Sequence, residues 1–249
     1  MATFVLVHGG FTDGSFWGDT AAGLTAAGHR ALVAELPSTG RSPEDLGGLG
    51  DDVAEVRRLI DSTDASDGPV ILVGHSYGGV VLTELADDPR VARSVYVAAA
   101  RPARGRSLGD LFGGALPSWT VAHPSGLALG TVDDAEVTRQ TFCAEMTPEE
   151  WAPWHAHQMG LLSSNAALSD AATAPDPTHP ATYVLCERDA AMPPPAQEAM
   201  AASADRVVRV PTSHWPMYVD RDGFLALLER EAEPADARSV GDAPSRLSP

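Results

Sequence analysis

The sequence contains no lysine, because all 17 of its Lys and Arg residues are arginine. The chain therefore cannot form a lysine Schiff base with a carbonyl substrate, and it has neither a phosphate-loop lysine nor a lysine general base. Positive charge is scarce overall, since 34 acidic residues give a formal net charge of −17. Nucleic acids and anionic membranes reward clustered positive charge, so we expect neither as a partner and expect a small molecule instead.

Cysteines and long apolar runs are also few. Cys143 and Cys186 lie far apart and lack metal-ligand spacing, so we expect two buried thiols. No stretch is long and apolar enough to span a bilayer, and the first residues show no signal-peptide pattern. A cytoplasmic location, a monomer or homodimer, and no cofactor are expected.

Short apolar runs alternate with segments of helical periodicity, which is typical of βαβ units. Most runs lack polar alternation, as parallel strands do when helices cover both faces of a sheet. Helices are expected around residues 15–27, 52–61 and 224–228 and directly after Tyr77, with Gly28 capping the first of them. The expected strands are residues 3–7, 31–35, 69–74, 94–98, 182–186 and 207–210.

One long segment, residues 101–179, interrupts this alternation. We expect it to be a helical cap inserted into an α/β core of residues 1–100 and 180–232. Such a cap, rich in large apolar side chains, would pack on the core and roof a pocket. Residues 233–249 have almost no large apolar side chain and are expected to form a disordered tail.

Two helices are expected to begin inside the cap. Asp133 with Glu136, and Thr147 with Glu150, have the spacing of capping boxes. Pro153 is expected to shorten or bend the second helix.

A G-x-S-x-G motif, Gly74-His75-Ser76-Tyr77-Gly78, lies between an expected strand and an expected helix. At such a turn the serine hydroxyl is exposed above the sheet, and the glycines let the backbone take a strained conformation. The next amide, that of Tyr77, then lies at a helix N-terminus, where it can stabilise an oxyanion. Ser76 is therefore the expected nucleophile.

Residues 8–11, His-Gly-Gly-Phe, follow the first expected strand. This loop lies beside the serine turn if the first and third strands are neighbours. We expect the Gly10 amide to be the second oxyanion donor, with the Phe11 amide as the alternative. His8 is expected to orient the loop by hydrogen bonding rather than to transfer protons.

A serine nucleophile needs a base and usually a carboxylate that holds the base in one tautomer. His214 follows the last expected strand, and Asp189 follows the fifth, with Glu187 as its competitor. Both loops reach the carboxyl edge of a parallel sheet. The order Ser76, Asp189, His214 along the chain is typical of one architecture with a G-x-S-x-G turn.

The remaining candidates concern metal and substrate. His155 and His157 lie beside acidic residues, but alternate residues of a helix point apart, so no metal site is expected. The side chains expected to line the substrate pocket are aromatic: Phe11, Trp119, Trp151, Trp154 and Trp215.

Four blocks together resemble the α/β-hydrolase fold superfamily, up to about residue 230: residues 4–10, residues 74–79, residues 183–189 with Pro193 and Gln197, and residues 213–217. Within it the chain is most similar to plant methylesterases, hydroxynitrile lyases and small bacterial esterases. The resemblance implies triad roles for Ser76, Asp189 and His214. It also implies a mostly parallel six-stranded sheet in the order 2-1-3-4-5-6.

Departures from the group narrow the chemistry. Hydroxynitrile lyases of this type place a lysine beside the catalytic histidine, where this chain has Trp215, so cyanohydrin cleavage by that route is disfavoured. A serine in place of an aspartate nucleophile likewise disfavours dehalogenase and epoxide hydrolase chemistry.

We therefore expect a serine hydrolase that cleaves a carboxylic ester, thioester or lactone of a small to medium, apolar molecule through an acyl-enzyme. One alternative is a biosynthetic tailoring enzyme, such as a cyclase, lyase or acyl-transfer enzyme, that uses the same pocket. Another is a ligand-binding receptor without catalysis, because fold alone does not fix function.

Overall fold

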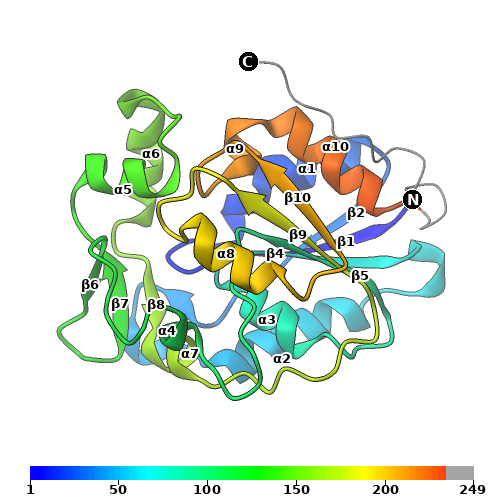
Figure 1. Cartoon of the computed structure of the whole chain (residues 1–249), viewed down its shortest axis with the longest axis horizontal. Helices are drawn as coiled ribbons and strands as arrows, with labels where there is room; N and C mark the ends of the chain where they lie inside the picture. The colour runs from blue at the N-terminus through cyan, green and yellow to red at the C-terminus, as the bar shows by residue number, and fades with distance from the viewer. Residues whose placement is uncertain (234–249) are drawn as a thin grey trace.

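The computed structural model describes residues 1–233 (Figure 1). Its main sheet runs in the order β10-β9-β5-β4-β1-β2 with every neighbouring pair parallel, which confirms the predicted order 2-1-3-4-5-6. The tail predicted to be disordered lies outside the described residues, except for residue 233. The six strands are β1 (Thr3–Val7), β2 (Arg30–Val33), β4 (Val70–His75), β5 (Val91–Val97), β9 (Ala181–Cys186) and β10 (Arg206–Val210).

Helices cover both faces of this sheet (Figure 1). On one face, α1 (Gly18–Ala26), which follows the 3-10 turn η1 (Gly14–Trp17), packs against α10 (Arg221–Glu231). On the other face, α2 (Leu49–Asp61) packs against α3 (Gly78–Glu84). The short helices α8 (Pro194–Ala201) and α9 (Pro216–Val219) follow β9 and β10, and the 3-10 turns η2 (Pro43–Asp45) and η3 (Ala65–Asp67) flank α2. Strands β1, β4 and β9 are buried along their whole length, as their continuous apolar runs predict.

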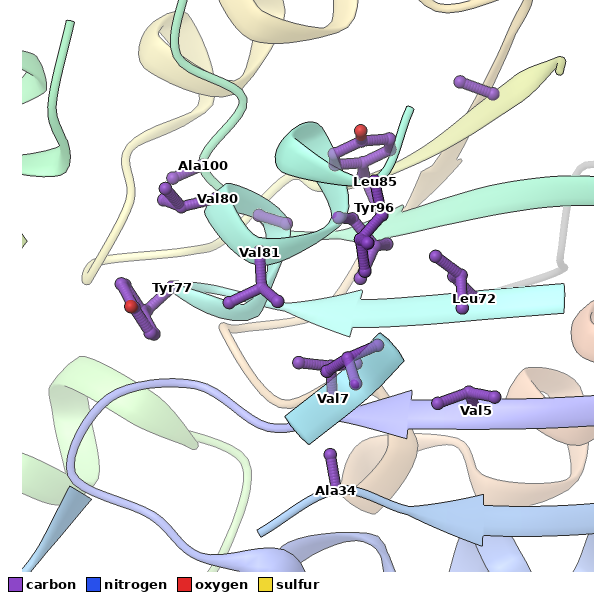
Figure 2. Packing of buried hydrophobic residues seen from close by; sticks show 14 of the residues in the cluster. Val5, Val7, Ala34, Leu72, Tyr77, Val80, Val81, Leu85, Tyr96 and Ala100 are labelled. Atoms are coloured by element: carbon purple, nitrogen blue, oxygen red, sulfur yellow. The ribbon is translucent and has the colours of Figure 1, made fainter. Parts of the chain in front are cut away.

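Figure 2 shows part of the buried cluster between α3 and the sheet. Val81 of α3 and Leu85, the residue directly after this helix, belong to the cluster together with Leu72 of β4 and Val7 of β1. Full burial of one such side chain contributes roughly 1.5–3 kcal/mol to the free energy of folding. Tyr77 stands where β4 turns into α3, so this turn is held between a buried strand and a buried helix.

The insertion contains four helices and also a small sheet that the sequence did not predict. Strands β6 (Thr120–Ala122), β7 (Ala128–Thr131) and β8 (Leu162–Ser164) are antiparallel, and β3 (Thr39–Gly40) of the core pairs with β8. Strands this short carry too little alternation to be recognised in sequence. The helices are α4 (Leu108–Leu111), α5 (Ala135–Phe142), α6 (Pro148–Gln158) and α7 (Asn165–Ser169).

The ends of the cap helices differ slightly from expectation. Asp134 rather than Asp133 caps α5, because its carboxylate accepts from the first-turn N–H groups. Thr147 and Glu150 form the predicted capping box of α6. Pro153 does not shorten α6, which continues to its end five residues later. Within residues 1–233, no helix is both long and apolar enough to cross a membrane.

Candidate active site

Ser76 occupies the turn between β4 and α3 with a φ of 52°, in the left-handed region that residues other than glycine rarely adopt. The turn is packed tightly, since a Cβ on Gly78 would lie 2.6 Å from the Val7 carbonyl oxygen. The Ser76 carbonyl accepts a hydrogen bond from the Ala100 N–H at 2.9 Å. These contacts hold the strained turn and leave the serine side chain lining a cavity.

His214 and Asp189 meet at the carboxyl edge of the sheet. His214 Nδ1 lies 2.7 Å from Asp189 Oδ2, and both side chains are buried. Because an ionised carboxylate can only accept, Nδ1 donates this bond and Nε2 is left to act as a base. Glu187, the competing acid, is exposed.

His214 lines the same cavity as Ser76. Within residues 1–233, the Ser76 hydroxyl forms no hydrogen bond, to His214 or to any other group. Contacts of this kind often tighten only when substrate binds.

Asp189 is held by a rigid set of donors. Its Oδ1 accepts from the Ala191 and Met192 N–H groups, both at 2.8 Å. Gln197, fully buried, donates to Asp189 Oδ2 at 3.0 Å and also bonds the backbone of Cys186 in both directions. In the sequence only the family resemblance marks Gln197, whereas in the structure its side chain holds the Asp189 carboxylate in place.

His8 orients the first loop. Its Nε2 accepts from the Leu36 N–H at 3.2 Å, so its Nδ1 donates to the Gly9 carbonyl at 2.8 Å. Burial lowers the pKa of His8 to about 4, which keeps the ring neutral. Both ring nitrogens are occupied by the backbone, as an orienting role requires.

His75, inside the G-x-S-x-G motif, makes a contact with the His214 loop that the sequence does not predict. Its Nε2 donates to the carbonyl oxygen of His214 at 2.9 Å. The ring also stacks on Phe16, with centroids 4.9 Å apart. No local pattern marks this role, because the partner lies 139 residues away.

Two residues that line the cavity have backbone N–H groups without an acceptor in the described part of the chain. Within the described chain, neither the Gly10 N–H nor the Tyr77 N–H forms a hydrogen bond, and both residues line the cavity. The Phe11 N–H, the alternative donor, is already bonded to Ser163 Oγ at 2.9 Å. Gly10 and Tyr77 are thus the amides available to an oxyanion.

The cavity has a volume of about 360 Å³ and is lined by residues of both core and cap. Phe11, Trp119 and Trp215 line it, but Trp151 and Trp154 do not, which corrects the sequence-based expectation. Both rings instead contact Trp215, with centroids 5.0 and 5.5 Å from its ring, so they join the inserted segment to the loop after β10. Further apolar side chains in the lining include Leu108, Phe112, Leu116, Leu129 and Met192.

The histidines and cysteines outside the site have other partners. His155 contacts Thr138 Oγ1 at 3.2 Å, whereas His157 contacts Asp13 Oδ2 at 2.8 Å, so the two rings point apart. Within residues 1–233, no three His, Cys, Asp or Glu residues form a group that could hold a metal ion. Cys143 is buried as a free thiol, and burial raises its pKa to about 12.

The chain is similar to a known protein family over most of its length and to individual relatives over about half of it or more. The model of the alpha/beta hydrolase family matches residues 4–227. A carbendazim hydrolyzing esterase from Nocardioides sp. is 42% identical over 122 residues, which are 47% of this chain and 50% of that protein, so the match spans half of that relative. Probable hydrolase R7 from Phoma sp. is 28% identical over 200 residues, 78% of this chain and 80% of that protein.

A solved structure has the same fold. The pyrethroid hydrolase of Sphingobium faniae JZ-2 has a TM-score of 0.79 at 20% identity, covering 95% of this chain and 99% of that one. At this identity the likeness concerns the fold and not the substrate.

Proposed function

Because the chain belongs to the alpha/beta hydrolase family, we propose that it is a serine hydrolase that cleaves a carboxylic ester, thioester or lactone through an acyl-enzyme. The observation that carries this proposal is the hydrogen bond between His214 and Asp189 at a cavity that Ser76 also lines. A buried histidine with one nitrogen fixed by a carboxylate is a base of defined tautomer. A serine in a left-handed turn beside it is the group such a base would activate.

The reaction follows from these roles. His214 Nε2 accepts the proton of the Ser76 hydroxyl while Oγ attacks the substrate carbonyl carbon. Asp189 stabilises the imidazolium that forms, and Nε2 then gives its proton to the leaving alcohol or thiol. Water, deprotonated by the same nitrogen, attacks the acyl-enzyme and releases the acid and the free serine.

The Gly10 and Tyr77 amides would bind the oxyanion of each tetrahedral intermediate. Their N–H groups have no acceptor within residues 1–233, so they need not break a protein hydrogen bond to do so. Loss of one such donor typically lowers kcat by about 100- to 1000-fold. The unused amides thus support the acyl-transfer assignment.

The cavity supports a small to medium, largely apolar substrate. Its volume is about 360 Å³, and most of its lining side chains are aliphatic or aromatic. Pockets of this size bury a compact ligand and use a few polar groups to orient it. The net charge of −17 further favours a neutral substrate over an anionic one.

The experiment that tests the proposal compares Ser76→Ala with Ser15→Ala, an exposed serine outside the cavity. Hydrolysis is followed on p-nitrophenyl esters of increasing acyl length, a thioester, a lactone and carbendazim, the compound named for one relative. We expect a fluorophosphonate probe to label the wild type and Ser15→Ala but not Ser76→Ala. Wild-type turnover by Ser76→Ala would contradict the proposal.

A further inference from the structure

Asp52 of α2 is a buried carboxylate that the proposed reaction does not use. It is 0% exposed. Its Oδ2 accepts from the Tyr77 hydroxyl at 2.6 Å, and its Oδ1 accepts from the Ser38 N–H at 2.9 Å. Burial of a carboxylate costs free energy that hydrogen bonds must offset, so both oxygens are strongly tied to these two donors.

Tyr77 links Asp52 to the cavity, because its side chain binds Asp52 while its backbone N–H is one of the two proposed oxyanion donors. The ring projects from the turn between β4 and α3, as Figure 2 shows, and it is 2% exposed. The same residue lines the cavity beside Ser76, and its backbone N–H has no acceptor within residues 1–233. A bond that fixes the phenol therefore restricts the direction in which this N–H points.

The second oxyanion segment is held from the cap. Ser163 Oγ of β8 accepts the Phe11 N–H at 2.9 Å. It also packs directly on the neighbouring glycine, since a Cβ on Gly10 would lie 3.0 Å from Ser163 Oγ. The loop that carries the Gly10 amide is therefore pressed against β8.

The Phe11 loop and the Asp52–Ser38 contact are both attached to β8, at the adjacent residues Ser163 and Ser164. The Ser38 carbonyl accepts from the Ser164 N–H at 2.9 Å, while the Ser38 N–H binds Asp52. The pairing of Thr39 in β3 with Ser163 continues this contact. One path thus runs from Tyr77 through Asp52 and Ser38 to β8, and the other runs from Phe11 to β8 directly.

We propose that Asp52 and Ser163 are positioning residues that set the two oxyanion-hole amides relative to each other through strand β8 of the cap. This inference rests on the proposed serine mechanism. It gives the cap a part in catalysis besides enclosing the substrate: its strand β8 helps to build the site that binds the transition state. Such groups act through preorganisation, so their loss affects the transition state more than substrate binding.

The test uses Tyr77→Phe and Ser163→Ala, with Tyr183→Phe and Ser94→Ala as matched controls. Tyr183 also has a buried hydroxyl, bonded to the Ala99 carbonyl at 2.7 Å, and Ser94 Oγ contacts His179 at 2.8 Å; neither residue lines the cavity. We expect the two test variants to lower kcat by about 10- to 100-fold while KM changes by less than about threefold. The controls should keep the wild-type kcat.

An arylboronic acid, which forms a tetrahedral anion on an active serine, gives a second readout. Its affinity should fall by the same factor as kcat in both test variants. Asp52→Ala combined with Tyr77→Phe should lower kcat by less than the product of the two single effects, because both changes remove the same hydrogen bond between Tyr77 and Asp52. Test variants that lose stability like the controls but keep kcat and boronate affinity would overturn the inference. Failure of fluorophosphonate to label wild-type Ser76 would instead overturn the proposed function, independently of these variants.

Discussion

His75 donates a hydrogen bond from Nε2 to the backbone carbonyl of His214 across 2.9 Å, so the residue before Ser76 holds the loop that carries His214. The two rings lie 4.5 Å apart, centroid to centroid. Burial, together with the charge that His214 can carry, lowers the pKa of His75 well below its ordinary value. His75 is therefore neutral, and its effect on His214 is one of position.

Replacement of His75 by phenylalanine should slow turnover. The new ring can still stack on Phe16, but the bond to the His214 carbonyl is lost. We expect kcat to fall about tenfold and the free energy of unfolding to fall by about 1 kcal/mol. The measurements are steady-state ester hydrolysis and urea unfolding.

His179→Phe is the control for this change, because His179 loses a contact with Ser94 that lies away from the cavity. It should lose similar stability and keep kcat. Equal kcat values for the two variants would show that the bond from His75 is only structural.

Replacement of Asp189 by asparagine should nearly abolish activity while the fold survives. The amide has the shape of the carboxylate, but it no longer selects the tautomer in which His214 Nε2 is unprotonated. In the serine protease triad a change of this kind lowers kcat by about 10⁴-fold, and we expect a similar loss. Glu187→Gln, at an exposed acid two residues earlier, should leave kcat unchanged. If Glu187→Gln instead lost ester hydrolysis and Asp189→Asn kept it, Glu187 would be the orienting acid.

Acid should destabilise the fold through His8. Burial lowers its pKa from 6.5 to about 4, so between these values the unfolded chain binds a proton that the folded chain does not. Above pH 6.5 His8 is neutral in both states and its titration does not affect stability, whereas as the pH falls from 6.5 to about 4 the proton bound by the unfolded chain lowers the free energy of unfolding by about 3 kcal/mol. Urea unfolding of the wild type and His8→Asn checks this directly. The stability difference between them should shrink across this window, and a constant difference would refute the assignment.

Gln158→Met should stabilise the protein. Gln158 lines the cavity, its side chain is 2% exposed, and within residues 1–233 neither Oε1 nor Nε2 of its amide has a protein hydrogen-bond partner, so the stability gain is expected for the substrate-free protein. An unsatisfied buried amide costs about 1–3 kcal/mol, so its removal should raise the free energy of unfolding by up to that amount. Gln197→Met is the opposite case, because the amide of Gln197 is fully bonded around Asp189. Urea unfolding should show a gain for the first variant and a loss for the second.

The sequence by itself determined the core sheet and the neighbourhood of the site. Continuous apolar runs mark β1, β4 and β9 because each is covered on both faces, a property visible in a window of five or six residues. Ser76 and Asp189 each come soon after such a strand, and His214 follows β10, the half-exposed strand at one edge of the sheet. Parallel strands bring the residues that follow them to one edge, so topology alone places the three loops together.

Only the tertiary structure decided the contacts between segments that are distant along the chain. The pairing of β8 with β3, the bond from His75 to His214 and the burial of Asp52 against Tyr77 all join residues with no local pattern in common. Trp151 and Trp154 illustrate the same limit. Their aromatic character predicted that they line the pocket, whereas in the structure both rings pack on Trp215. Strand and helix signals are short-range, whereas the partner of a buried polar group or a large ring is set by how separate elements pack.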